Sequence, residues 1–214
     1  MLEHDDSQYV CGADEVGRGC LFGPVVAAAV VLPKDLKEDD IEKWWSQIKD
    51  SKKVSIKKRE KLSKFIKENA LAYSIQEISH NIIDEVNILE ASITAMESSI
   101  DAVCDTLKEC DILLDSILID GNRFRRCYML PGAEEVIIPH TCCEKGDDKH
   151  LCIAAASIIA KVYRDDLITK GCEENDEWNL YDLKNNKGYG TLKHRTALAN
   201  HGPIFGHRRS FKLC

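Results

Sequence analysis

The sequence predicts an α/β protein, with a mixed β-sheet that carries helices on its faces and a helical extension at the C-terminus. Apolar runs typical of strands come first, and further strand-like runs then alternate with segments whose apolar residues recur every three or four positions. The length of 214 residues suits one domain, or one domain with a small lobe. We expect a core over residues 1–170 and a basic helical lobe over residues 171–214, packed together as a single structural unit.

The first half of the chain contains strong signals for a strand and for a helix. Val25–Leu32 is apolar throughout, which predicts a buried strand that pairs with one beginning near residue 8. Asn87–Cys110 has apolar residues at alternating four- and three-residue spacing, which predicts a long helix. Between them we expect a short helix over Asp39–Lys49, a basic helix over Lys57–Asn69 and a strand over Ala70–Ile78.

The second half begins with a short apolar run, Asp115–Asp120, which ends in a carboxylate before Gly121 and predicts a strand meeting a turn. Val136–Ile138 predicts another brief strand, closed by Pro139. Leu151–Thr169 is apolar on most faces, so we expect a helix buried between layers. A loop rich in Asn and Gly then runs to Gly190, and Leu192–Asn200 is the last predicted helix.

The composition is that of an ordinary globular protein, with 44% hydrophobic and 30% charged residues. No apolar run approaches the roughly 20 residues of a membrane helix, and the acidic N-terminus lacks an apolar signal region. We therefore expect an intracellular, cytoplasmic protein with no membrane partner. Ten cysteines are present without any C-x-x-C pair, which argues against a zinc site and favours free thiols in a reducing compartment.

The charge is distributed unevenly. The net charge is −7, yet the segment from Leu183 to Cys214 contains no Asp or Glu. A basic segment on an acidic body is a typical footprint for a polyanion, although a basic tail is about as often a solvated or disordered end. Its seven bases are Lys184, Lys187, Lys193, Arg195, Arg208, Arg209 and Lys212.

Two adjacent carboxylates, Asp14 and Glu15, stand between an apolar run and the glycine turn Gly17-Arg18-Gly19. Like charges at the end of a core strand repel each other, and their desolvation is costly unless a cation or hydrogen bonds compensate. The two glycines let the backbone adopt positive φ or approach a ligand closely. The arginine between them is a fork-shaped donor to phosphate. A solvated transition from strand to turn is the alternative interpretation.

Two further carboxylates extend this group. Asp120 ends a predicted strand, and Asp165 falls on the helical stripe defined by Leu151, Ala154, Ile158 and Val162. Asp166 is turned by about 100° from that stripe, so the spacing favours Asp165 without deciding between them. Four converging carboxylates need a counter-charge, and magnesium is the natural cation for oxygen ligands. Two such ions about 4 Å apart can activate a water and stabilise the leaving oxygen of a phosphodiester. Each acid taken singly could instead be a surface residue or a helix cap.

Short motifs are spread over nearly the whole chain. They are DEVGRG at 14–19 followed by Phe22-Gly23-Pro24, DSKK at 50–53, IDGN at 119–122, KGD at 145–147, AAASIIAKVYRD at 154–165, KGYGT at 187–191 and HGPIFGHRRSF at 201–211. Taken together, and in this order, these motifs resemble those of the type 2 ribonuclease H family, the ribonucleases HII. The related type 3 enzymes usually carry a different residue, often threonine or lysine, where Arg18 stands.

The resemblance implies a ribonuclease H-like mixed sheet with a helical C-terminal lobe. It also implies that the catalytic, metal-binding carboxylates are Asp14, Glu15, Asp120 and Asp165, the last chosen over Asp166 because it directly follows Arg164. Gly17, Arg18 and Gly19 would hold the backbone around a ribonucleotide, and Tyr189 would pack against the adjoining sugar. A Tyr189 ring tucked into the core is the alternative.

The activity implied by the resemblance is endonucleolytic hydrolysis. The enzyme would cut the RNA strand of RNA/DNA hybrids, and duplex DNA on the 5′ side of an embedded ribonucleotide. Two divalent ions, Mg²⁺ or Mn²⁺, would assist, and the products would carry 3′-hydroxyl and 5′-phosphate ends. The 2′-hydroxyl would distinguish the target from DNA. We expect the chain to act as a monomer.

Three other functions compete with this one. A type 3 ribonuclease H activity is the nearest. A phosphatase of the haloacid dehalogenase type is suggested by ILIDGN, but that family needs a second acid where Asn122 stands. A non-catalytic nucleic-acid binder would keep the basic tail and lose a carboxylate, and none is missing. Metal-dependent cleavage of a labelled duplex separates these possibilities.

Overall fold

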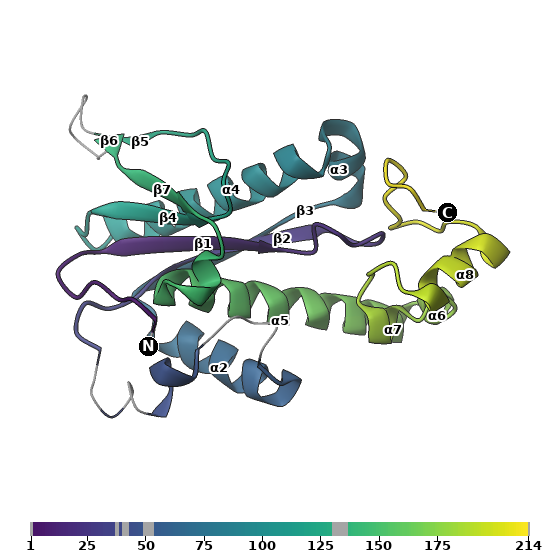
Figure 1. Ribbon diagram of the computed structural model, residues 1–214, viewed down its shortest axis with the longest axis horizontal. Helices are drawn as coiled ribbons and strands as arrows, with labels where there is room; N and C mark the ends of the chain where they lie inside the picture. Colours follow the sequence, from purple (N-terminus) through teal and green to yellow (C-terminus); the bar gives the residue numbers. More distant parts are fainter. Residues whose placement is uncertain (1, 37–38, 40–42, 49–53, 130–136, 214) are drawn as a thin grey trace.

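The computed structural model describes residues 2–36, 39, 43–48, 54–129 and 137–213. Its centre is a five-stranded sheet in the order β3-β2-β1-β4-β7 (Figure 1). The first three strands in this order pair antiparallel, while β1–β4 and β4–β7 pair parallel. The strands are β1 (Val10–Val16), β2 (Val25–Val31), β3 (Ala72–Ile78), β4 (Ser116–Asp120) and β7 (His140–Cys143). The predicted mixed sheet is therefore confirmed.

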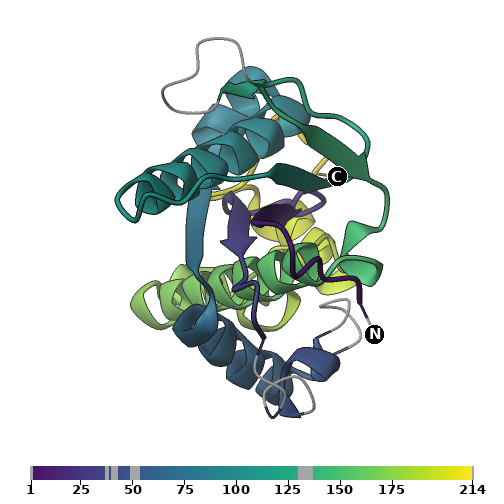
Figure 2. The same cartoon turned by 90° about the vertical axis from the view of Figure 1, so that its left-hand side faces the viewer.

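Helices cover both faces of this sheet, as the end-on view in Figure 2 shows. Helix α4 (Ile88–Lys108), preceded by α3 (His80–Val86), packs on one face. Helix α5 (Leu151–Glu174) packs on the other, with α2 (Ile56–Asn69) outside it. All seven residues of β2 are buried, because alternate side chains enter the core on the α5 side and the core on the α4 side.

Close contact between β1 and α5 sets how deeply the helix sits against the sheet. A Cβ placed on Gly12 would lie only 2.4 Å from the carbonyl carbon of Cys152. Only glycine therefore permits this approach. The first ten residues of α5 are all buried, as expected for a helix between two layers. Its position brings the later turns of α5 to the end of β1.

The C-terminal segment packs against the loop that follows β1. It contains α6 (Asp176–Asn179), α7 (Leu183–Asn186) and α8 (Leu192–His201), and its core cluster includes Leu21 and Phe22. The chain after α8 returns to this loop, where His207 forms an isolated bridge with Phe22. The helical C-terminal extension is confirmed. Residue 170, the predicted boundary of the lobe, lies inside α5, and that division stays a prediction.

Several parts of the chain differ from the sequence expectation or lie outside the described residues. The predicted brief strand ends before Pro139 as expected, but Ile137–Ile138 (β6) pairs with Tyr128–Met129 (β5) in a separate two-stranded ribbon, and a strand that was not predicted, β7, follows Pro139. Helix α3 was not predicted, and α5 continues to Glu174. Of the predicted helix at 39–49, the structure describes a 3₁₀ turn, Trp45–Gln47 (η1), with a few neighbours. The DSKK motif at 50–53 lies outside the described residues.

Within the described residues no helix is long and apolar enough to cross a membrane. The nine cysteines in this part of the chain are free thiols.

Candidate active site

Asp14 and Asp120 lie side by side at the ends of two parallel strands. The register of β1 and β4 pairs Ala13 with Ile119, so one further step places Asp14 opposite Asp120. Ala13 and Ile119 point into the core beneath α4. Because side chains alternate along a strand, both aspartates point to the opposite face, toward α5. The parallel pairing thus places two carboxylates that are far apart in the sequence next to each other.

The carboxylate of Asp14 is deeply buried, with 5% of the residue exposed. Burial is the main cause that raises its pKa well above the ordinary value, and the negative charges of Glu15, Asp120 and Asp147 raise it further. A hydrogen bond from Ser157 on α5 acts in the opposite direction. Asp14 is therefore a carboxylate whose ionised form gains strongly from a nearby cation.

Glu15 points along the same end of β1 and pairs with the glycine turn. Its Oε1 accepts from Arg18 Nη1 over 3.0 Å. Burial raises the pKa of Glu15, and the charge of Arg18 lowers it in part. Its second oxygen, Oε2, is buried and has no hydrogen-bond partner among the described residues. A buried carboxylate oxygen without a partner is costly, so this atom is suited to a ligand.

A fourth carboxylate, Asp147, reaches this group from the short 3₁₀ turn η3 (Gly146–Asp148). The backbone N–H of Gly146 donates to Asp120 Oδ1 over 2.7 Å, which fastens the turn to the end of β4. Asp147 is 8% exposed, and its charge acts on Asp14. A Cβ at Gly146 would lie 2.5 Å from Ile153 Cδ1, so glycine allows the turn to sit this close. The KGD motif had marked this segment, but its acid had not been chosen as a ligand.

Asp165, the expected fourth ligand, is not brought into this group. Its Oδ1 lies 2.7 Å from Lys161 Nζ, and its Oδ2 lies 3.8 Å from Arg59 Nη1 on α2. Asp165 is eight residues beyond Ser157, which contacts Asp14, and this corresponds to roughly 12 Å along the helix. Three residues of the stripe used to place it, Leu151, Ala154 and Ile158, pack in the core that α5 shares with α2 and the sheet. We therefore replace Asp165 by Asp147 in the candidate site.

The glycine turn after β1 combines one glycine required by the fold with one that is not. Gly17 has φ of 91°, and a Cβ there would lie 2.3 Å from Arg164 Nε. Gly19 has ordinary φ, is exposed, and a Cβ there would meet no protein atom within 4 Å. The fold therefore needs glycine at position 17, whereas the open side of Gly19 offers space to a ligand.

Two fully buried arginines hold the loop that contains this turn. Arg164 on α5 donates to the carbonyls of Pro24, Phe22 and Lys187. Arg208, from the C-terminal segment, donates to the carbonyls of Gly23 and Arg18. Burial and the charge of Arg164 lower the pKa of Arg208 to about 10, which leaves it charged at neutral pH. The C-terminal segment is thus part of the scaffold of the candidate site.

Tyr189 lies directly beside the glycine turn. Cys20 and Tyr189 form an isolated antiparallel bridge, and Leu21 donates its N–H to the Gly188 carbonyl over 2.8 Å. The tyrosine is 38% exposed, and Lys161 Nζ lies 5.5 Å from the centre of its ring. Burial beside Cys20 raises the pKa of its hydroxyl to about 12, so the phenol stays protonated. Tyr189 is thus partly covered by the protein and partly open to the surface.

The family model for ribonuclease HII matches residues 11–214 of this sequence. The chain belongs to the ribonuclease HII family. A ribonuclease HII of Bacteroides thetaiotaomicron is 44% identical over 94% of this chain and 88% of its own length. Among solved structures, the ribonuclease H2 of Pyrococcus horikoshii matches with a TM-score of 0.66 and 25% identity, covering 95% of this chain and 94% of that chain. Bst-RNase HIII in complex with Mn²⁺ matches with a TM-score of 0.63 and 20% identity, over 97% of this chain and 68% of its own, and shows the common fold.

Membership in the ribonuclease HII family gives this chain its reaction class. It is a type 2 ribonuclease H, an endonuclease that hydrolyses phosphodiester bonds of nucleic acid. The family is dependent on divalent metal ions. The expected family, the ribonuclease H-like fold and the enzyme class are all confirmed.

The residues present fit the metal that the ribonuclease HII family requires. Among the described residues, no three or more His, Cys, Asp or Glu side chains lie close enough together to hold a metal ion without moving. Their chemistry nevertheless suits a hard divalent cation, because the donors are carboxylate oxygens and Glu15 Oε2 is buried without a partner. The mutual repulsion that raises the pKa of Asp14 is relieved by the same positive charge.

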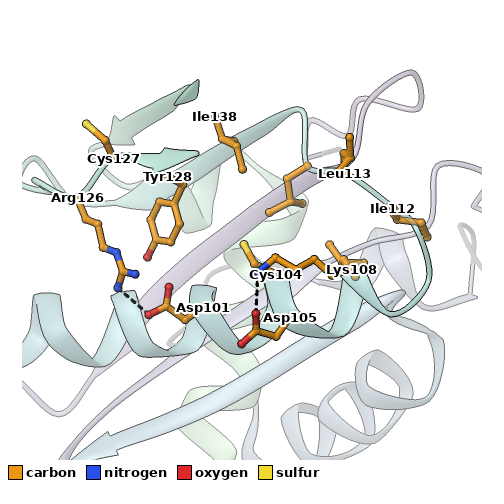
Figure 3. A pocket seen from close by; sticks show the side chains of 12 residues that line it. Asp101, Cys104, Asp105, Lys108, Ile112, Leu113, Arg126, Cys127, Tyr128 and Ile138 are labelled. Carbon is orange, nitrogen blue, oxygen red and sulfur yellow. Dashed lines mark hydrogen bonds and ion pairs between the residues drawn. The ribbon is translucent and has the colours of Figure 1, made fainter. Parts of the chain in front are cut away.

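A separate hollow of about 420 Å³ lies on the α4 side of ribonuclease HII, away from these carboxylates. In Figure 3, Asp101 of α4 points toward Arg126, whereas Asp105 points to Lys108 on its own helix. Burial raises the pKa of Cys104 to about 11, so this thiol is a poor nucleophile at neutral pH. Asp101 is already paired with Arg126 over 2.6 Å. Among the described residues of the hollow there is no buried carboxylate oxygen without a partner, in contrast to Glu15 Oε2 in the carboxylate site.

Proposed function

We propose that this ribonuclease HII cuts the RNA strand of RNA/DNA hybrids and cuts duplex DNA on the 5′ side of an embedded ribonucleotide. The products would carry 3′-hydroxyl and 5′-phosphate ends. One observation carries the proposal: the buried Asp14 has the charges of Glu15, Asp120 and Asp147 around it, beside the glycine turn and Tyr189. A carboxylate cluster next to an open backbone turn is suited to phosphodiester hydrolysis at a recognised sugar.

Asp14, Glu15, Asp120 and Asp147 would together hold two divalent cations, Mg²⁺ or Mn²⁺. Such ions, when bound, supply the charge that activates a water and stabilises the leaving 3′-oxygen. The chain supplies the fixed donor set. Asp14 is oriented by Ser157, Asp120 by the N–H of Gly146, and Glu15 by Arg18. Support from these neighbours keeps each carboxylate in place as charges change.

Recognition of the ribonucleotide would fall to the glycine turn and Tyr189. The absence of a side chain at Gly19 lets the backbone of the turn approach the 2′-hydroxyl, the group that distinguishes RNA from DNA. The exposed part of the Tyr189 ring would pack against the adjoining deoxyribose. All of the proposed residues come from one chain, which supports action as a monomer.

Cleavage of a DNA duplex containing one ribonucleotide tests the proposal directly. We expect a single cut on the 5′ side of the ribonucleotide in Mg²⁺ or Mn²⁺, none in EDTA, and a 5′-phosphate that a phosphatase removes. A matched duplex of DNA alone is the control. Cleavage on the 3′ side, or ends bearing a 2′,3′-cyclic phosphate, would refute the proposed chemistry.

The same assay tests Tyr189 through two substitutions. Tyr189→Ala should lose activity at an isolated ribonucleotide with little change in melting temperature, since stacking of this kind is worth about 1–3 kcal/mol. Tyr189→Phe keeps the ring and should retain much of the activity. If Tyr189→Ala unfolds the protein and cleavage falls only with the folded fraction, the ring serves the core.

A further inference from the structure

Two histidines are buried together behind Tyr189 and take no part in the carboxylate site. His194 on α8 is fully buried, and His207 in the C-terminal segment is 1% exposed. Their Nε2 atoms lie 3.0 Å apart. His194 Nδ1 lies 3.0 Å from the carbonyl oxygen of Tyr189. His207 Nδ1 lies 3.1 Å from the backbone nitrogen of Ile204 and 3.2 Å from the carbonyl oxygen of the same residue. Each of the four ring nitrogens therefore has a hydrogen-bond partner.

When both rings are neutral, these contacts determine which nitrogen of each ring carries the proton. A carbonyl oxygen only accepts, so His194 Nδ1 carries a proton and donates to Tyr189. In neutral His194 the Nε2 atom is then an acceptor, and it must receive a proton from His207 Nε2. The remaining nitrogen, His207 Nδ1, is left as the acceptor of the N–H of Ile204. The result is a one-directional chain of hydrogen bonds from Ile204 through both rings to Tyr189.

The direction of this chain depends on the neutral state of both rings. A second proton on His194 would turn its Nε2 into a donor, and His207 would then have to carry its own proton on Nδ1, which lies 3.2 Å from the Ile204 carbonyl oxygen. Aromatic neighbours pack around the pair: Tyr181 meets both rings, and Phe22 meets His207 edge to face. Burial lowers the pKa of His194 and lowers that of His207 to about 4, so both are neutral near pH 7.

The charged groups around the pair act in both directions. Arg195 lowers the pKa of His194 and Asp182 raises it, while His80 on α3 and His194 lower that of His207. Besides these, the titratable hydroxyl of Tyr181 belongs to the surroundings, and it donates to the Gly202 carbonyl over 2.7 Å. None of these neighbours is a carboxylate paired directly with either ring, which leaves the neutral relay as the favoured arrangement.

We propose that His194 and His207 are positioning residues, forming a neutral histidine relay that fixes the Tyr189 backbone and so aims its ring at the sugar beside the ribonucleotide. The relay rests on the proposed role of Tyr189. The Tyr189 carbonyl also accepts from Thr191 N–H over 2.8 Å, so the relay adds a second constraint from the C-terminal segment. The segment that holds the glycine turn through Arg208 would in this way also hold Tyr189 through His207.

The experiment compares two substitutions at His207 in the full chain. His207→Phe keeps an aromatic ring against Phe22 and Tyr181 but removes the donor to His194. His207→Gln places an amide N–H₂ where Nε2 stands and can restore that donor. We expect His207→Phe to lower kcat at a single ribonucleotide by about 10- to 100-fold with KM little changed, as a small misplacement does. His207→Gln should recover most of this loss, and His201→Phe, in the same helix as His194 but outside the relay, should behave as wild type.

Two measurements separate positioning from simple support of the fold. Nitrogen NMR at pH 7 should show His194 protonated at Nδ1 and His207 at Nε2. In a double-mutant cycle, His207→Phe should cost no further activity once Tyr189 is alanine, because the relay acts through that ring. An additive loss, or the opposite tautomers, would overturn the relay. If Tyr189→Ala alone keeps full activity, the proposed role of Tyr189 fails and the relay with it. If Tyr189→Ala loses activity but His207→Phe does not, only the relay fails.

Discussion

The backbone N–H of Gly146 donates to Oδ1 of Asp120 over 2.7 Å, joining a 3₁₀ turn to the end of the central parallel strand. This bond sets the next residue, Asp147, against the pair formed by Asp14 and Asp120. The candidate site is therefore built from strand ends and one tight turn. Helix α5 contributes the supporting Ser157, while its Asp165 is engaged with Lys161 and Arg59.

Alanine at the two turn glycines should have opposite consequences. Gly19→Ala should fold with an unchanged melting temperature, because its Cβ meets no protein atom within 4 Å, yet lose cleavage at the ribonucleotide. Gly17→Ala should instead be destabilised, since the residue has φ of 91° and its Cβ would meet Arg164. Melting temperature and cleavage rate are measured for both. Normal cleavage by Gly19→Ala would show that the substrate does not approach the turn there.

Removing one charge from the cluster should separate activity from stability. Asp14→Asn or Asp120→Asn should abolish cleavage while keeping the fold, because the amide preserves the shape but lacks the charge. In EDTA, Asp14→Asn should melt higher than wild type, since burial and neighbouring acids disfavour the carboxylate. For a chain of this size, 1 kcal/mol corresponds to about 2–4 °C in Tm. A variant that cleaves like wild type would remove its residue from the site.

The basic C-terminal segment should bind the duplex through only some of its charges. Arg208 is fully buried, the Lys187 amine contacts the Thr169 hydroxyl, and Arg195 donates to the Gly190 carbonyl. These three act within the protein, so a loss of affinity on mutating them would mix structural and electrostatic effects.

Lys193, whose side chain is 79% exposed, gives the sharper test. Lys193→Gln should lower the slope of log affinity against log salt by about 0.9, the value for one lost phosphate contact. Lys64→Gln is the matched control, because Lys64 has a similarly exposed amine on α2 paired with Glu68. Binding is measured in EDTA by fluorescence anisotropy. Equal slopes for wild type and Lys193→Gln would mean that this lysine faces away from the nucleic acid.

Stability should fall on acidification through the histidine pair. Because the folded pKa of His207 is lowered from 6.5 to about 4, the unfolded chain binds more protons between these values. The free energy of unfolding should therefore be highest above about pH 6.5 and decrease toward pH 4, by at most about 1.4 kcal/mol per pH unit for one group. Urea unfolding of wild type and His207→Gln between pH 5 and 8 measures the difference. Parallel curves would contradict a neutral, buried His207.

The sequence predicted the elements whose signals are strong and local. The apolar run of β2 and the periodic spacing of α4 led to correct assignments, because burial of those faces dictates the pattern. Strand β7, HTCC, is short and largely polar, and it owes its place to parallel pairing with β4, which no local pattern reveals. Helix α3 is similarly short, with one buried residue.

The structure brings together three of the four carboxylates that we expected in the site. Asp14, Glu15 and Asp120 end apolar strands, so the pattern marks them. Helix α5 is buried on most faces, so a stripe on it does not define one direction, and Asp165 was chosen from the resemblance by its place directly after Arg164. Asp147 lies in a turn without periodicity. Its signal was the preceding Gly146, whose missing side chain leaves room for Ile153.

The central claim, that Asp147 completes the metal-binding carboxylates, is tested most directly by comparing Asp147→Asn with Asp165→Asn. Both are assayed for cleavage of the single-ribonucleotide duplex and, by calorimetry, for Mn²⁺ binding, with Asp148→Asn as the exposed control beside Asp147. We predict that Asp147→Asn loses cleavage and weakens Mn²⁺ binding, whereas Asp165→Asn lowers stability but cleaves in proportion to its folded fraction. Full cleavage and unchanged Mn²⁺ affinity in Asp147→Asn, with loss of both in Asp165→Asn, would contradict the account.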